Sequence, residues 1–396
     1  MDYFARLGAA LEDAWGEHRR EEEHFPDAAL EVLARLPPAE ALDRDALLDH
    51  LLDLHRPALL PLAPLGAFGQ PGFTVHRGHG FVVELYHWIE SLSAIHNHPF
   101  CGAFTIVHGH SVHARYHVGD VEPLGGRAQR VSLRLEGLDL LTEGDVVPFS
   151  LHRHPLVHAL IHVPRSSISM VVRTVRTEGY YRYLPPSLAL PMEGTAPPRD
   201  RQLALLEALD AVGDPSLPQR LGRLLDHADY ELALRLLSAY WPGHTPTERE
   251  AAIERARARL GDAASLLTPA LDRALILQQT TSVRESLTDP ALRLVAVALG
   301  YAEQRDQVMA LLSARGLDPL ATLHRFVDET GMFEGDEQAS ALIAHVLIDG
   351  GDASAAIERL RSAYGAEAVA GHETEVVEFC EGSMFSVLRR SSHAGG

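Results

Sequence analysis

Hydrophobic positions at the start of the chain recur at helical spacing. Tyr3, Leu7 and Leu11 lie four residues apart, and Trp15 continues the same stripe. Further apolar segments follow Pro26 and Pro38, so residues 1–70 are predicted to form an N-terminal helical segment that ends in an irregular stretch rich in Pro, Leu and Gly.

The pattern changes in residues 71–192, where short runs rich in Val, Ile, Phe and Thr are separated by Gly, Pro and Asp. Seven or more short strands at this spacing predict a β-sandwich or β-barrel. The predicted strands are 80–87, 102–107, 111–118, 130–135, 145–149, 157–163 and 167–175.

Residues 193–396 again have helical spacing, with a short disordered tail expected at the C-terminus. Thr245-Pro246, Asp289-Pro290 and Asp318-Pro319 each combine an N-cap residue with proline at the first helical position. We therefore expect an α+β protein in which a central barrel lies between N-terminal helices and a C-terminal helical bundle or repeat domain.

Composition limits the classes of partner. The net charge of -19 argues against a nucleic acid or an anionic membrane surface as the main partner. The basic residues are all Arg, which we interpret as GC-rich bacterial coding, and the two cysteines, Cys101 and Cys380, indicate a reducing compartment. No secretory signal and no apolar run of about 18 residues are visible, so a cytoplasmic protein is expected.

Histidine is the one unusual residue, because 13 of the 23 histidines lie between His76 and His162. His96 and His98 stand two residues apart at the start of an apolar run, with Gly109 marking a turn after it. Since alternate residues of a strand point to one face, both imidazoles can enter one cavity and share a metal ion. The pair is therefore the leading candidate for a metal site.

These residues resemble the first motif of the cupin superfamily, which continues from His-x-His to a Glu and then to a Gly. The spacing to Gly109 is met, but the Glu position falls on Gly102. That departure resembles the cysteine (thiol) dioxygenase branch, in which three histidines and no carboxylate hold iron. Trp88 and Ile95 also match that branch, and the resemblance covers less than a third of the chain. It implies a double-stranded β-helix fold for the central barrel.

The third ligand is expected from the second motif, in a later strand. We favour His158, because alternation along 157–163 puts His158, Leu160 and His162 on one face. His154 is the alternative. The ligand set is therefore expected to be His96, His98 and His158.

Further residues are candidates for binding or catalysis. His162 and His108 could orient a ligand or move a proton, and Arg173 or Arg77 could hold an anionic group. Trp88 fits either substrate stacking or barrel packing. Cys101 fits either a pocket wall or a small buried hydrophobe. His113, Arg115 and His117 are expected to form one solvated strand face.

The resemblance implies a mononuclear non-haem iron oxygenase that uses Fe(II) and O2 to oxidise a small polar or anionic molecule, such as a thiol or an amino acid. Zinc, manganese or nickel would instead indicate a non-redox isomerase or lyase, because imidazole alone does not select iron. A third hypothesis is a ligand-sensing module whose C-terminal helical domain binds a protein or carrier partner.

Overall fold

The computed structural model describes residues 3–53, 59, 71–90, 94–151, 153, 155–175, 179–192, 197–333 and 338–389. They form two compact units. One contains residues 1–115, 135–178 and 280–396, and the other contains residues 116–134 and 179–279. No helix among the described residues is both long and apolar enough to cross a membrane.

Strands β1 to β11 lie in the central part of the sequence. Their bounds are β1 Gly72–Arg77, β2 Phe81–Ile89, β3 Ile95–Asn97, β4 Gly102–His108, β5 Ser111–Gly125, β6 Ala128–Leu141, β7 Val146–Phe149, β8 Val157–His162, β9 Ser166–Thr174, β10 Tyr181–Leu184 and β11 Leu188–Pro191. One sheet has the order β1-β2-β9-β4-β7, and the other six strands form a closed barrel in the order β10-β11-β6-β5-β8-β3. The predicted α+β fold, in which a central β-barrel lies between helical segments of the sequence, is confirmed.

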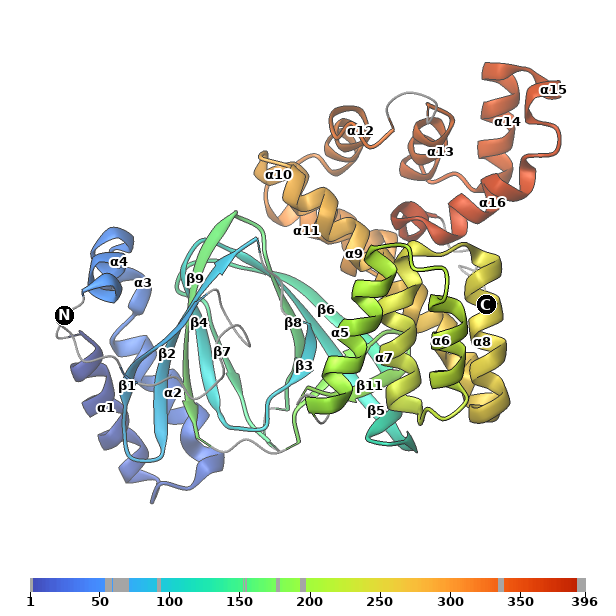
Figure 1. Ribbon diagram of the computed structural model, residues 1–396. Helices are drawn as coiled ribbons and strands as arrows, with labels where there is room; N and C mark the ends of the chain where they lie inside the picture. The colour runs from blue at the N-terminus through green and yellow to red at the C-terminus, as the bar shows by residue number, and fades with distance from the viewer. Residues whose placement is uncertain are drawn as a thin grey trace. The chain divides into compact units, whose positions relative to one another are not determined.

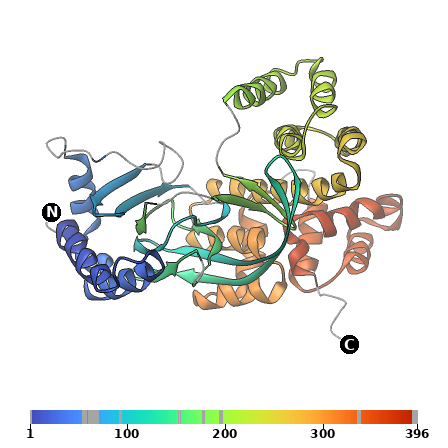
Figure 2. The ribbon, with the colours of Figure 1, turned by 90° about the horizontal axis from the view of Figure 1, so that it is seen from below.

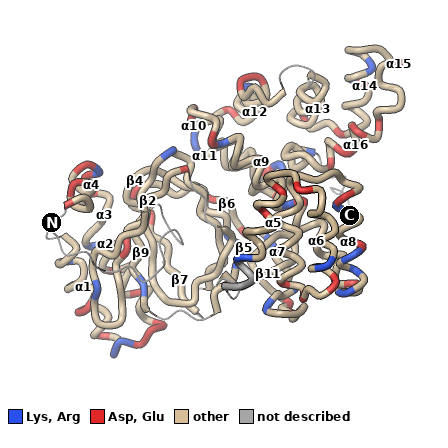
Figure 3. The backbone as a smooth tube through the Cα atoms, viewed as in Figure 1, with Lys and Arg blue, Asp and Glu red and all other residues tan. Residues whose placement is uncertain are grey.

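The N-terminal helices cover one face of the five-stranded sheet (Figures 1 and 2). They are α1 Tyr3–Glu17, α2 Phe25–Arg35, α3 Pro38–Ala41 and α4 Arg44–Leu52. Leu7, Leu11 and Trp15 of α1 pack in one buried cluster with Phe81 and Met170 of the sheet, so the predicted stripe is the face that α1 buries. Charged residues gather on α4, whereas β4 and β7 carry none (Figure 3).

The opposite face of this sheet lines a cavity together with residues of β3 and β8. Alternation along β2 puts Leu85 in the core beneath the helices and Tyr86 and Trp88 on the other face. Alternation along β4 separates Ala103 from Phe104 in the same way. Each strand therefore has one face in the core beneath the helices and the other face toward the cavity described below.

The end of α9 and the helices that follow it belong to the same unit. These helices are α10 Pro290–Tyr301, α11 Arg305–Ala314, α12 Pro319–Glu329, α13 Gln338–Ile348, α14 Ala353–Tyr364, α15 Ala366–Val369 and α16 Glu373–Gly382. Two nearly fully buried arginines connect them to the barrel. Arg284, at the end of α9, donates to the His162 carbonyl, and Arg293 of α10 pairs with Glu90 beyond the end of β2. The end of α9 and α10 are therefore joined to the strands by hydrogen bonds and an ion pair.

The second unit has its own core. Its helices are α5 Pro197–Ala211, α6 Leu217–Leu225, α7 Tyr230–Tyr240, α8 Pro246–Leu260 and most of α9 Leu267–Ser286. They pack on the β10–β11 hairpin, with Leu190, Tyr230 and Leu237 in one buried cluster. The predicted capping box at Thr245 is present, and Asp289 and Asp318 cap α10 and α12 as expected.

Candidate metal centre

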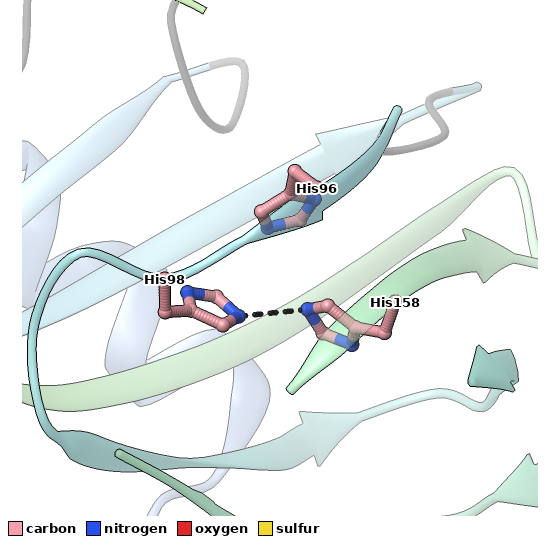
Figure 4. A group of neighbouring side chains, drawn as sticks. All are labelled: His96, His98 and His158. Atoms are coloured by element: carbon pink, nitrogen blue, oxygen red, sulfur yellow. Dashed lines mark hydrogen bonds between the residues drawn. The ribbon is translucent and has the colours of Figure 1, made fainter. Parts of the chain in front are cut away.

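Three histidines from two neighbouring strands meet in a cavity that the five-stranded sheet also lines. His96 lies on β3, His98 follows the same strand, and His158 lies on β8 directly opposite His96 in the antiparallel register. One ring nitrogen from each lies within 4.8 Å of the other two. Figure 4 shows the rings of His98 and His158 directed at one another, with His96 beside them. The structure thus brings together the three residues named from the sequence.

Hydrogen bonds to the far side of two rings determine which nitrogen faces the others. His96 donates from Nδ1 to the carbonyl oxygen of Ala94 at 2.7 Å, which leaves its Nε2 with a lone pair. His158 Nδ1 lies 2.9 Å from Nε2 of His113, so His158 also presents Nε2 to the site. Phe149 stacks on His98, with ring centroids 4.2 Å apart, and restricts its ring plane.

The spacing between two of the imidazoles fits a bound cation. Nε2 of His98 lies 2.9 Å from Nε2 of His158. With metal–nitrogen bonds of about 2.0–2.1 Å, this separation subtends an angle of about 90° at the metal. That is the angle between neighbouring ligands of an octahedral ion. If both nitrogens carry lone pairs, they repel each other unless a cation lies between them.

Burial keeps the three rings in the form that binds metals. Desolvation lowers the pKa of His96 to about 4, although its bond to Ala94 opposes the shift. Desolvation likewise lowers the pKa of His98 and of His158 well below the ordinary value, and the neighbouring histidines add to the effect. The imidazoles are therefore neutral at pH 7 and available as ligands.

No carboxylate joins the cluster among the residues that the structure describes. A side chain at Gly102, the position of the usual cupin Glu, would begin only 2.2 Å from the carbonyl oxygen of Val172 on the adjacent strand. Since that neighbour is backbone, the strands would have to separate to admit one. The close β4–β9 approach thus explains glycine at this position and favours a site of imidazoles alone.

The three rings form part of the wall of a cavity of about 60 Å³. The remaining wall is mainly apolar and aromatic, contributed by Tyr86, Trp88, Phe100, Phe104, Phe149, Leu160, Ser169 and Val171. Trp88 donates from its indole nitrogen to the Ser169 hydroxyl at 2.8 Å. A metal held by the histidines would therefore lie in an enclosure of low polarity, in which electrostatic interactions are strong.

Of the two predicted anion-binding arginines, one is paired with a buried carboxylate and the other lies outside the cavity wall. Arg173 is buried and donates to Glu84 at 2.8 Å, and its guanidinium lies over the Phe100 ring. Glu84 also accepts from the Tyr86 hydroxyl at 2.7 Å. The charge of Arg173 is thus already balanced within the protein. Arg77 is an exposed residue of β1 and is not part of the cavity wall.

Cys101 and His108 also differ from expectation. Cys101 is fully buried, but it lies in the core between the five-stranded sheet and the N-terminal helices, because alternation along β4 directs it away from the cavity. Of the two predicted roles, pocket wall and small buried hydrophobe, Cys101 therefore has the second. His108 is half-buried and contacts Glu143 at 3.2 Å, outside the cavity wall. Neither residue is therefore placed to contact a substrate in this cavity.

His162 and Trp88 lie side by side. The ring of His162 stacks on Trp88, with centroids 4.6 Å apart, and its Nδ1 lies within hydrogen-bond distance of the hydroxyls of Ser111 and Ser167. Trp88 lines the cavity whereas His162 does not, so His162 supports the wall from behind. His154, the alternative third ligand, lies outside the described residues.

The sequence interpretation missed His113. Its position in β5 predicts a solvated face shared with Arg115 and His117, yet His113 is buried and hydrogen-bonded to His158. The first four residues of β5 are all buried, and exposure begins only at Arg115. The small apolar residues Val112 and Ala114 flanking His113 were the available signal. His113 is the residue that orients His158.

Comparisons with known proteins leave the family open. No family model matches the chain, and no curated protein matches it. Among solved structures, it is similar to an uncharacterized conserved protein with a double-stranded β-helix domain from Klebsiella pneumoniae subsp. pneumoniae MGH 78578. The identity is 17%, over 32% of this chain and 96% of that chain, with a TM-score of 0.20. The fold and the site are therefore described from this chain's own geometry.

Proposed function

We propose that this protein is a mononuclear non-haem iron oxygenase of the cupin type, similar to the thiol dioxygenases. The observation that supports the proposal is the convergence of His96, His98 and His158, neutral and without a carboxylate, in a buried aromatic cavity. Three neutral ligands leave a divalent ion with its full charge and with open positions for an anionic substrate and O2.

Iron(II), when bound, would supply the electron transfer between substrate and dioxygen that zinc, which has no redox chemistry, does not. The residues of the chain have separate tasks. His113 fixes the ring of His158, and Phe149 fixes the ring of His98. Trp88 and Phe104 exclude water from the space beside the histidines.

The cavity wall also bears on the substrate. Because Glu84 balances Arg173, no uncompensated guanidinium contributes to the described wall. An anionic substrate would therefore be held by the metal ion itself, and its remaining atoms would contact aromatic side chains. This favours a small chelating thiol, amino acid or carboxylic acid over a multiply charged molecule.

Metal analysis combined with oxygen uptake tests the proposal. The full chain is purified anaerobically, loaded with Fe(II), and assayed in an oxygen electrode with thiols, amino acids and small carboxylic acids. We expect stoichiometric iron and substrate-dependent oxygen uptake, both abolished in His96→Ala. His79→Ala, at an exposed position away from the cavity, is the matched control and should retain both. Full iron loading without uptake on any substrate would contradict the oxygenase.

A non-redox metal enzyme is the second candidate, because three imidazoles with an open position are also the donor set of catalytic zinc sites. Zinc, manganese or nickel retained through purification, together with inactivity of the iron-loaded protein towards O2, would favour an isomerase or lyase.

We retain as a separate proposal that the C-terminal helices bind a protein or carrier partner. The full chain is the appropriate bait, since residues 280–396 belong to the same compact unit as the five-stranded sheet and the three histidines. Cross-linking in cell extract followed by mass spectrometry should identify such a partner through peptides of these helices.

A further inference from the structure

A second histidine cluster lies far from the barrel site in sequence, on helices α12 and α13, which are neighbours in Figure 1. Each helix carries the same pattern of a histidine followed four residues later by an aspartate. The pairs are His324 and Asp328 on α12, and His345 on α13 with Asp349 directly after the end of that helix. Residues four apart lie on one face of a helix, so each helix presents both groups to its neighbour.

The hydrogen bonds cross between the helices. Nε2 of His324 lies 3.0 Å from a carboxylate oxygen of Asp349, and Nε2 of His345 lies 3.1 Å from a carboxylate oxygen of Asp328. A carboxylate only accepts hydrogen bonds, so each ring carries its proton on Nε2. In a neutral imidazole the other nitrogen, Nδ1, then has a lone pair.

The two Nδ1 atoms lie only 2.7 Å apart. The ring centroids are 5.0 Å apart and the ring planes differ by 22°, so the rings lie nearly edge to edge. Two lone pairs at this distance repel each other unless a cation, either a proton or a metal ion, lies between them. The flanking carboxylates add two negative charges that favour such a cation.

We propose that His324 and His345 form a second binding site, for a divalent transition-metal ion held by both Nδ1 atoms. A carboxylate that accepts from the far nitrogen of a metal-bound imidazole is the usual second partner in such sites, and here both rings have one. With bonds of about 2.0–2.1 Å, two neighbouring ligand nitrogens lie about 2.9 Å apart. The Nδ1 atoms therefore separate by only a few tenths of an ångström, and both rings tilt towards a common point.

The surroundings leave room for that movement and for the remaining ligands. The side chains of His324 and His345 are 32% and 27% exposed, so water can complete the coordination. An ion here joins α12 to α13, and this link would stabilise the pair of helices in proportion to metal occupancy.

The test is Zn²⁺ binding to the metal-stripped full chain, measured by equilibrium dialysis and isothermal titration calorimetry. We expect two ions per wild-type chain, one in His324→Ala, one in His98→Ala and none in the double variant. His372→Ala, at an exposed C-terminal histidine that also has a carboxylate partner, should still bind two. Asp349→Asn should raise the dissociation constant of the second ion about tenfold without changing the barrel ion.

The measured stoichiometries distinguish a metal ion from a proton between the two Nδ1 atoms. If the barrel binds no zinc, wild type binds one ion and His324→Ala none, which still supports the second site. Equal stoichiometry in wild type and His324→Ala means that only a proton occupies the gap and overturns the proposal. Binding that requires millimolar zinc overturns it as well. Circular dichroism of each variant checks that its fold is retained.

Discussion

Replacing His113 tests whether the site depends on the orientation of His158. When Nε2 of His158 faces a metal, its Nδ1 carries the proton and donates to Nε2 of His113 at 2.9 Å. His113→Phe keeps a ring of similar size in this buried position and removes the acceptor. We expect the substitution to weaken metal binding while the barrel still folds.

The magnitude follows from how the bond changes on metal binding. A neutral hydrogen bond contributes about 0.5–1.5 kcal/mol net and one involving a charged group about 1.5–3 kcal/mol. Binding a cation polarises His158 towards the charged case, so the loss costs about 1–1.5 kcal/mol more in the metal-bound state. This difference corresponds to a roughly tenfold higher dissociation constant. Mutation of such outer partners typically costs about 10–100-fold, and the two estimates agree at the lower end.

The assay is competition against a chelator of known affinity, in a His324→Ala background so that the second cluster does not contribute. His113→Gln, whose side-chain carbonyl can replace the acceptor, should recover most of the affinity. His117→Ala, at an exposed position on the same strand, should bind as wild type does. If His113→Phe binds metal as tightly as wild type while His158→Ala does not bind, His113 has no positioning role and the reasoning is refuted.

Three further substitutions examine the surroundings of the site, and each is measured by urea unfolding. Gly102→Ala should destabilise by about 1–3 kcal/mol, because its methyl group meets the Val172 carbonyl, whereas Gly16→Ala in open space on α1 should stabilise by up to about 1 kcal/mol. Phe149→Ala should cost about 3–5 kcal/mol and also weaken metal binding by releasing the ring of His98; loss of stability alone would contradict the second effect. Arg173→Met should cost about 3–5 kcal/mol by leaving the Glu84 carboxylate buried without its counter-ion, and an unchanged urea midpoint would disprove that dependence.

The parts of the molecule that sequence could predict are those set by local periodicity. Strand alternation predicted that His96 and His98 share a face, and the resemblance to the second cupin motif, together with alternation along 157–163, favoured His158 as the third residue. The turn at Gly109, with φ of +93°, lies where its spacing required. Helix starts such as Thr245 were predictable because capping is a property of four consecutive residues.

The errors have a common physical origin, which is contact between distant segments. Arg173 pairs with Glu84 because β2 and β9 are adjacent in the sheet, and strand order is not encoded in either strand alone. His113 belongs to the first four residues of β5, which are all buried, so period-two alternation does not describe the start of this strand. Cys101 faces the helices because the N-terminal segment covers that side of β4. The predicted domain boundaries at residues 70 and 192 remain predictions.

Glu90 provides a comparison of a buried and an exposed ion pair on one carboxylate. It adopts a left-handed backbone conformation, with φ of +47°, beyond the end of β2. Arg293, 1% exposed, contacts both of its oxygens, at 2.6 and 3.3 Å, and also donates to the Val163 carbonyl. Arg165, which is 62% exposed, contacts the same carboxylate at 2.6 Å. The two arginines thus approach Glu90 to the same distance, although one is buried and the other is exposed.

Burial decides the expected result. Arg293→Met leaves several carbonyls without a donor and removes one partner of a buried pair, so unfolding free energy should fall by about 3–5 kcal/mol. Arg165→Met should cost less than about 1 kcal/mol, because water screens an exposed pair. Desolvation opposes ionisation of Glu90, but hydrogen bonds from Arg293 and Arg165 lower its pKa overall. The stabilisation from ionised Glu90 is therefore complete above the ordinary carboxyl pKa of 4.5. It is lost as the pH falls through the lowered pKa of Glu90 in the folded protein. Equal losses for the two variants at pH 7 would show that proximity to Glu90, and not burial, sets the strength of this connection between α10 and the barrel.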